Sequence, residues 1–261
     1  MSVPELSNLC LTGAPNFRDL GGYLTSDDRR VKCGRVFRSG DSGNLTPEDI
    51  ALMQRLGAKL VVDLRSDTEA KANEIRWPVE KAEFVAANIL ADLRAGNKSI
   101  IELLQQDPTP HGAGAMMETT YSVLPHALGP TIAHIARRIV AGNTPVVFHC
   151  SIGRDRAGIT AAMLLFALGV PRDTVIADYL RTNVHINAGF IREITKTYLA
   201  RQGTELDEET LDILTFARIE HFHAAFRTVK VEYGTVTAYL DTIGIDAAMG
   251  EGMRERLLEP A

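Results

Sequence analysis

The chain carries one short stretch in which a cysteine, two arginines and an aspartate lie close together: His149-Cys150-Ser151-Ile152-Gly153-Arg154-Asp155-Arg156-Ala157-Gly158. A cysteine thiolate is a strong nucleophile, and an arginine guanidinium can bind a phosphate through two parallel hydrogen bonds. One loop that holds Cys150 and Arg156 can present both groups to the same anion. The stretch therefore predicts nucleophilic attack by Cys150 on a bound oxyanion such as phosphate.

The apolar runs on either side predict how this stretch is held. Residues 145–148 are apolar and predict a buried strand, and residues 159–170 predict a helix. A loop that caps a helix N-terminus points several backbone N–H groups inward, and the helix dipole adds positive potential there. The predicted result is a nest for a tetrahedral oxyanion, in a field that also favours the thiolate.

Composition excludes several classes of protein. The 261 residues are 45% hydrophobic and 23% charged, which is typical of a globular protein with a sizeable core. The net charge of −5 gives no electrostatic case for nucleic-acid binding. No apolar run approaches the length of a membrane span and residues 1–30 show no signal-peptide pattern, so we expect a cytoplasmic protein without integral membrane association.

Cysteine and histidine spacing predicts a protein without metal or other cofactor. The three cysteines, Cys10, Cys33 and Cys150, are too widely spaced for a disulfide framework. No Cys/His cluster has the spacing of zinc ligands.

Hydrophobic patterning predicts a single α/β domain over residues 1–261, with a central, mostly parallel sheet flanked by helices. Strands are expected at 36–40, 59–65, 82–87 and 145–149. Helices are expected at 46–56, 130–141, 171–180 and through most of 188–240.

Residues 88–128 have a less regular pattern. Short helices are expected at 98–106 and 116–124, with a loop at 107–114 because two prolines and two glycines fall there. The segment lies between the predicted sheet and the phosphate loop, so it is either a helical lid over the site or a surface insertion.

The stretch around Cys150 resembles the phosphate-binding loop of cysteine-dependent protein tyrosine phosphatases. More narrowly, the chain is similar to their atypical bacterial and fungal branch, which includes tyrosine/serine and phosphoinositide phosphatases. That branch has further characteristic segments, which are matched in order across residues 14–245. They correspond here to residues 16–22, 37–39, 63–66 and 178–183.

The resemblance implies a metal-independent phosphomonoester hydrolase that forms a phosphocysteine at Cys150. Arg156 would bind the phosphate, and Asp155 would be the general acid, with Asp63 and Asp107 as alternatives. The implied substrate is a phosphorylated protein or a phosphoinositide. The other loop positions expected to surround the substrate are Ser151, Ile152, Gly153, Arg154, Ala157 and Gly158.

Five residues outside the reacting groups are expected to support them. His149 is interpreted as a hydrogen-bond anchor for the loop rather than as a base. Asp63 and Arg65 follow a predicted strand at the sheet edge where ligands bind in α/β proteins. With Asp19 and Arg38, they either line the site or brace it through ion pairs, and bracing is favoured.

Two positions depart from the branch pattern. Arg154 stands where lysine is usual, and Ala157 stands where many relatives have a hydroxyl residue. Without that hydroxyl beside the thiolate, we expect slower breakdown of the phosphoenzyme. The alternatives are a catalytically weak phosphate-binding module and another oxyanion-using enzyme, such as an arsenate reductase in which Cys33 approaches Cys150.

Overall fold

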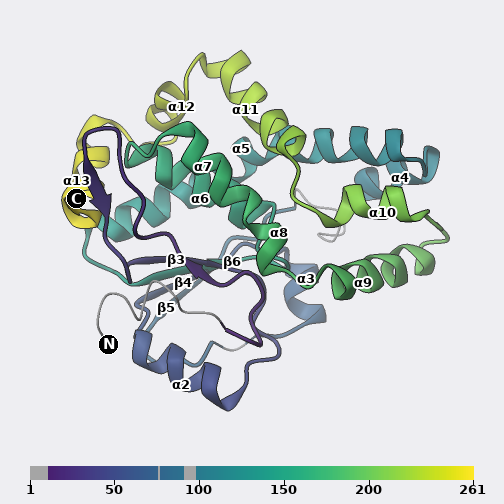
Figure 1. Ribbon diagram of the computed structural model, residues 1–261, viewed down its shortest axis with the longest axis horizontal. Helices are drawn as coiled ribbons and strands as arrows, with labels where there is room; N and C mark the ends of the chain where they lie inside the picture. Colours follow the sequence, from purple (N-terminus) through teal and green to yellow (C-terminus); the bar gives the residue numbers. More distant parts are fainter. Residues whose placement is uncertain (1–10, 76, 91–97) are drawn as a thin grey trace.

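The computed structural model describes residues 11–75, 77–90 and 98–261 and shows an α/β fold (Figure 1). Within these residues, a central sheet has the strand order β1-β3-β6-β4-β5. Strands β3, β6, β4 and β5 are parallel, and β1 runs antiparallel to β3. The strands are β1 (Arg18–Asp19), β3 (Val36–Ser39), β4 (Leu60–Asp63), β5 (Glu83–Ala86) and β6 (Val146–His149).

The register of the parallel strands brings the loops that carry the predicted site residues together at one edge of the sheet. Ser39 of β3 and Asp63 of β4 both pair with His149, the last residue of β6. The loops that follow these three strands therefore leave the sheet side by side. This is the edge at which parallel α/β sheets bind ligands.

Alternate strand residues fill two cores, one on each face of the sheet. Val146 and Phe148 pack into the larger core, whereas Val147 packs into the smaller one. Helix α2 (Pro47–Leu56) covers the smaller core, and most other helices lie on the opposite face (Figure 1). The remaining helices are α3 (Asp67–Ala72), α4 (Lys98–Gln106), α5 (Pro110–Val140), α6 (Arg156–Ala167), α7 (Arg172–Leu180), α8 (Thr182–His185), α9 (Ala188–Arg201), α10 (Glu208–Thr215), α11 (Ile219–Tyr233), α12 (Val236–Thr242) and α13 (Ala247–Leu257).

The predicted fold class, with its mostly parallel sheet and flanking helices, is confirmed. A small second sheet was not anticipated. It pairs β2 (Arg29–Val31) with β7 (Leu258–Pro260) and so joins segments from near the two ends of the chain. Within the described residues, no helix combines the length and apolar character needed to cross a membrane.

The predicted loop at 107–114 is wrong, because α5 already begins at Pro110 and continues through Pro125 and Pro130 to Val140. Thr109 accepts a hydrogen bond from the backbone of Gly112, and Pro110 occupies the first turn. Helix α2 begins in the same way, with Thr46 as its N-cap and Pro47 in its first turn. Burial along the helix outweighs the glycine and proline signals.

Helix α5 also limits the predicted lid at 88–128. Met116, Tyr121, Leu124 and Leu128 are fully buried in the larger core. The part of the segment within α5 is therefore core and not a surface insertion. In α4, Ile101 and Leu104 are buried in the same core. Residues 91–97 lie outside the described residues, so a lid over the site stays a prediction.

Candidate active site

Cys150 lies where the middle strand of the sheet ends and a buried helix begins. It follows β6 directly, and α6 starts at Arg156. Cys150 is 1% exposed, and the backbone N–H of Gly153 donates a hydrogen bond to its Sγ at 3.2 Å. Because a charged acceptor strengthens such a bond, the loop favours the thiolate over the thiol.

Gly153 gives the loop its shape. Its φ of 77° is in the left-handed region, and a Cβ there would lie 2.5 Å from the carbonyl carbon of Ser39. Only glycine fits this position without strain. Its carbonyl accepts hydrogen bonds from Asn16 Nδ2 at 2.7 Å and from Arg38 Nη2 at 2.6 Å. The amide thus faces the sulfur while the carbonyl is fixed from behind.

Asp178 of α7 holds the arginines behind the loop. Its carboxylate accepts hydrogen bonds from Arg38 Nη1 at 2.7 Å, Arg18 Nε at 3.0 Å and the Tyr23 hydroxyl at 2.9 Å. Both arginines and the aspartate are almost completely buried. Burial alone would raise the pKa of Asp178, but the two guanidinium groups hold it far below its usual range.

Arg156 is held by Glu69, a residue that the sequence analysis missed. Its Nη1 and Nη2 donate to Oε2 and Oε1 of Glu69 at 2.6 and 2.7 Å, and Arg156 is completely buried. Glu69 also forms a capping box with Ser66 at the start of α3. The pattern Ser-x-x-Glu directly after a strand was the available signal for its position, although not for its partner.

Glu69 also reaches the first residue of the loop after Cys150. The Ser151 hydroxyl donates to Oε1 of Glu69 at 2.5 Å. Burial alone would raise the pKa of Glu69, but the hydrogen bonds and charge of Arg156, together with Ser151, lower it to about 2. The carboxylate is therefore ionised at neutral pH.

Asp155 and Arg154 form a buried pair on the side of the loop that faces α5. Arg154 donates to the Asp155 carboxylate from Nε at 2.7 Å and from Nη2 at 3.1 Å. The Tyr121 hydroxyl donates to the same carboxylate, and Arg154 Nη1 donates to the Leu214 carbonyl at 2.6 Å. Arg154 and Asp155 are each 3% exposed, so neither is a solvated loop residue.

Asp63, Arg65 and His149 lie beside the loop. Arg65 donates to Asp63 from Nη2 at 2.8 Å and to the Asn73 carbonyl from Nη1 at 2.9 Å. Burial lowers the pKa of His149 to about 4, against the opposing effects of Asp63 and of a hydrogen bond with the Cys150 backbone. His149 is therefore neutral at neutral pH, and its role as a loop anchor stays a prediction.

Asp19 lies farther from the loop. Its carboxylate accepts hydrogen bonds from the backbone N–H groups of Gly21 at 2.8 Å and Gly34 at 2.5 Å. Burial raises its pKa to about 6, although these bonds oppose the shift. Gly34 precedes β3, whereas the loop adjoins the other end of that strand, so Asp19 braces a turn and does not line the site.

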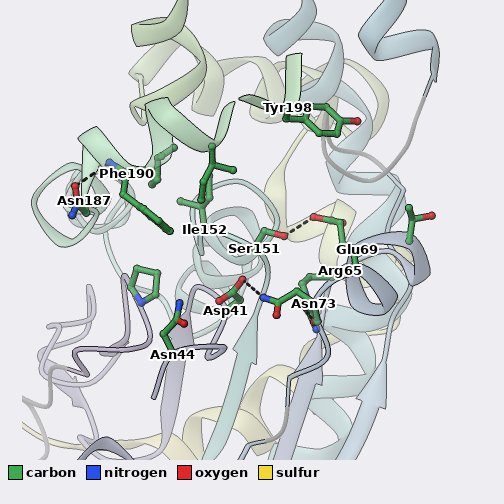
Figure 2. Close-up of a pocket in the computed structure, with 15 residues that line it drawn as sticks. Asp41, Asn44, Arg65, Glu69, Asn73, Ser151, Ile152, Asn187, Phe190 and Tyr198 are labelled. Carbon is green, nitrogen blue, oxygen red and sulfur yellow. Dashed lines mark hydrogen bonds between the residues drawn. The ribbon is translucent and has the colours of Figure 1, made fainter. Parts of the chain in front are cut away.

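A pocket of about 420 Å³ opens over the start of the loop (Figure 2). Phe190 and Ile194 of α9 give it an apolar wall, and Asp41 and Asn73 face that wall from the other side, joined by a hydrogen bond of 3.1 Å. The predicted residues that line it are Ser151, Ile152 and Arg65. The side chains of Arg154, Asp155 and Ala157 do not, because Arg154 and Asp155 bind each other and Ala157 is buried in the larger core.

The geometry gives no support to a redox relay between Cys33 and Cys150. Cys33 precedes β3 whereas Cys150 follows β6, and the two strands are parallel. The cysteines therefore lie near opposite edges of the sheet, separated by at least the length of a four-residue strand, about 13 Å. Within the described residues, no group of three or more His, Cys, Asp or Glu side chains could hold a metal ion.

The fold and the loop define a cysteine-dependent phosphatase, and comparisons with known proteins agree. A model of the tyrosine phosphatase family matches residues 9–259. The chain is 33% identical to a Cupriavidus necator protein named as a tyrosine-protein phosphatase, over 96% of this chain and 89% of that protein. It is 30% identical to the triple specificity protein phosphatase PtpB of Mycobacterium tuberculosis, over 95% of this chain and 98% of PtpB.

The chain therefore belongs to the tyrosine phosphatase family and is a phosphoric monoester hydrolase that acts on phosphorylated substrates. Its family implies a phosphocysteine intermediate.

Proposed function

We propose that the protein hydrolyses phosphotyrosyl residues of proteins, with Cys150 as the nucleophile and Arg156 as the phosphate clamp. The observation that carries this proposal is the arrangement of the loop. The N–H of Gly153 points at the sulfur of Cys150, and Arg156 is fixed in orientation by two hydrogen bonds to Glu69. A guanidinium held in this way is preorganised for phosphate, so little reorganisation accompanies the reaction.

The reaction has two steps. The Cys150 thiolate forms a bond to phosphorus as the bond between phosphorus and the tyrosyl oxygen breaks, and that oxygen takes a proton from a general acid. The same group then removes a proton from water, which attacks the phosphocysteine. Inorganic phosphate leaves and the thiolate is restored.

We assign the acid role to Asp155, which directly precedes Arg156 in the loop. Each alternative also has partners of its own: Asp63 is bound to Arg65, and hydrogen bonds from Thr109 and His111 lower the pKa of Asp107. Asp155 is preferred because it alone belongs to the loop that carries Cys150 and Arg156. To act as the acid, Asp155 has to exchange a bond from Arg154 or Tyr121 for one to the leaving oxygen.

The pocket supports an aromatic phosphate ester over a polyphosphorylated inositol. Phe190 and Ile194 offer apolar surface to a ring. The only Lys or Arg among the described lining residues is Arg65, which already binds Asp63. A headgroup with several phosphates would instead need several cations around it.

A substrate panel tests this preference. The wild-type protein should turn over phosphotyrosyl peptides many times per molecule, with a larger kcat/KM than for phosphoserine peptides or phosphoinositide vesicles. Cys150→Ser should remove activity on every substrate. A single turnover per molecule would instead indicate a phosphate-binding module, and a preference for vesicles would overturn the substrate assignment.

Leaving-group dependence tests the acid. Asp155→Asn should lower kcat about 100-fold or more for alkyl phosphates and much less for p-nitrophenyl phosphate, whose leaving group needs no proton. Asp41→Asn is the matched comparison because Asp41 is the aspartate that lines the described pocket. If Asp41→Asn shows the leaving-group dependence and Asp155→Asn does not, the assignment of Asp155 is wrong.

The proposed location is the cytoplasm, where a reducing environment keeps a thiolate nucleophile in its active form. Cell fractionation with an antibody to the protein tests it. Recovery in an oxidising compartment would contradict this proposal.

A further inference from the structure

Asp41 is a charged residue of the pocket that the proposed chemistry does not use. It lies shortly after the end of β3 and lines the pocket opposite Phe190 of α9 (Figure 2). Its backbone N–H donates a hydrogen bond to the Ser151 carbonyl at 3.2 Å, and Ser151 directly follows Cys150. Asp41 therefore lies directly beside the phosphate loop.

In the part of the chain that the structure describes, the Asp41 carboxylate has no cationic partner. It accepts hydrogen bonds from two neutral groups, the Gly43 N–H at 3.2 Å and Asn73 Nδ2 at 3.1 Å. Arg65 and Glu69, the other charged residues of the described lining, are each held in an ion pair. The uncompensated charge of this lining is thus negative and lies at Asp41.

A negative charge at this place disfavours the binding of phosphate by itself. A dianionic phosphate in the loop beside Ser151 is repelled by a carboxylate in the same pocket. The two hydrogen bonds do not require the charge, because the neutral side-chain carbonyl of an asparagine could accept the Gly43 N–H as well. A cation on the substrate would remove the repulsion, since it would neutralise Asp41 as the phosphate binds.

We propose that Asp41 is a specificity-determining residue, which binds a lysine or arginine side chain next to the phosphotyrosine of a protein substrate. The inference rests on the proposed function and narrows its substrates to phosphotyrosines with a basic neighbour. The pocket of about 420 Å³ offers the tyrosyl ring the apolar wall of Phe190 and Ile194, which leaves the opposite side, with Asp41, to the neighbouring residue. Asp41 is half-buried, so this ion pair is partly shielded from water and stronger than a fully exposed one.

Matched phosphotyrosyl peptides measure the preference. The peptides differ only in the residue directly before or directly after the phosphotyrosine, which is arginine, glutamine or glutamate. In at least one of the two positions, kcat/KM of the wild type should be about three- to tenfold larger with arginine than with glutamine. It should be smaller again with glutamate. The preference for arginine should weaken as NaCl is added, because salt screens the ion pair.

Asp41→Asn separates the charge of this residue from its shape. The variant keeps an oxygen for the Gly43 N–H, and its preference for arginine over glutamine should fall to less than twofold. Asp67→Asn is the matched control and should keep the wild-type preference, because Asp67 is an exposed residue of α3 that does not line the pocket. If Asp41→Asn does not fold, Asp41→Ser takes its place, since a serine hydroxyl can also accept from Gly43.

The possible outcomes are distinct. Equal kcat/KM values for the arginine and glutamine peptides in the wild type overturn the role of Asp41. A preference for arginine that persists in Asp41→Asn, or that is lost equally in Asp67→Asn, overturns it as well. Failure of the wild type to turn over even the glutamine peptides would instead overturn the proposed function, because those peptides carry no charge next to the phosphotyrosine.

Discussion

Asp178→Asn tests whether a buried carboxylate behind the loop is needed to hold its shape. The change keeps the size of the side chain but removes the charge that two buried arginines share. Arg18 Nε and Arg38 Nη1 lie 3.0 and 2.7 Å from the carboxylate oxygens. Arg38 in turn donates to the Gly153 carbonyl. We therefore expect the substitution to lower the free energy of unfolding and to disturb the geometry of the loop.

The size of the effect follows from burial. Removing one partner of a buried ion pair costs roughly 3–5 kcal/mol, because the remaining charge is left uncompensated. Here two guanidinium groups lose their common partner, and their side chains are 5% and 0% exposed. Such a loss is a large fraction of the roughly 5–15 kcal/mol that stabilises a typical protein, and it corresponds to a fall in Tm of about 10 °C.

Urea denaturation at pH 7 measures the change in the free energy of unfolding. Asp173→Asn is the matched control, because Asp173 lies on the same helix and is exposed. The difference between Asp178→Asn and wild type should narrow as pH falls below about 4. A carboxyl whose folded-state pKa is depressed contributes stability above its unfolded pKa and loses it on acidification.

The reasoning is refuted if Asp178→Asn unfolds within about 1 kcal/mol of wild type at pH 7, a difference common for ordinary substitutions. It is also refuted if Asp173→Asn costs as much. A stable Asp178→Asn protein with an unchanged kcat would mean that Arg38 holds the Gly153 carbonyl without Asp178 as a counter-ion.

Three other substitutions test different parts of the loop. Gly153→Ala forces a Cβ to 2.5 Å from the Ser39 carbonyl carbon and should lower kcat at least tenfold, whereas Gly234→Ala, with a similar φ but open space, should not. Because the pKa of His149 is lowered to about 4 in the folded protein, the free energy of unfolding of the wild type should fall by up to about 1.4 kcal/mol per pH unit as the pH drops from about 6.5 to 4. In His149→Asn this pH dependence should be weaker by the same amount. Arg154→Lys cannot keep the paired bonds to Asp155 and should lower the free energy of unfolding in urea by about 1–3 kcal/mol. Equal kcat values for the two alanine variants, an unchanged pH slope, or wild-type stability of the lysine variant would contradict these expectations in turn.

Local pattern was sufficient to predict the four parallel strands and the phosphate loop. Strands β3, β4 and β6 are short runs buried on both faces, so their positions depend on their own residues. The loop is equally local, since Cys150 and Arg156 belong to one strand–loop–helix unit. The common edge of the sheet then followed from the rules for parallel strands.

Contacts between residues that are distant in sequence could not be predicted from local pattern. Glu69 was missed because its role depends on Arg156, 87 residues later, and a capping glutamate looks the same whether or not it also binds an arginine. Arg154 was placed toward substrate, but the position of the Leu214 carbonyl and of Tyr121 turns the Arg154–Asp155 pair inward. The sequence predicted a loop and two shorter helices in place of α5, because glycine and proline are strong local signals. In the structure, burial of the helix in the core outweighs those signals.

The ion pair between Arg38 and Asp178 also determines when the active site can form during synthesis of the chain. Asp178 lies 140 residues after Arg38 and 160 after Arg18, with the cysteine between them. During synthesis, the nucleophile is therefore made before the residue that completes the support of its loop. A nascent chain that ends before α7 contains Cys150, Arg156 and Glu69 but lacks the contact that draws the N-terminal arginines behind Gly153. Formation of the active site should thus depend on long-range closure of the fold, and the thiolate should become reactive only after α7 has been synthesised.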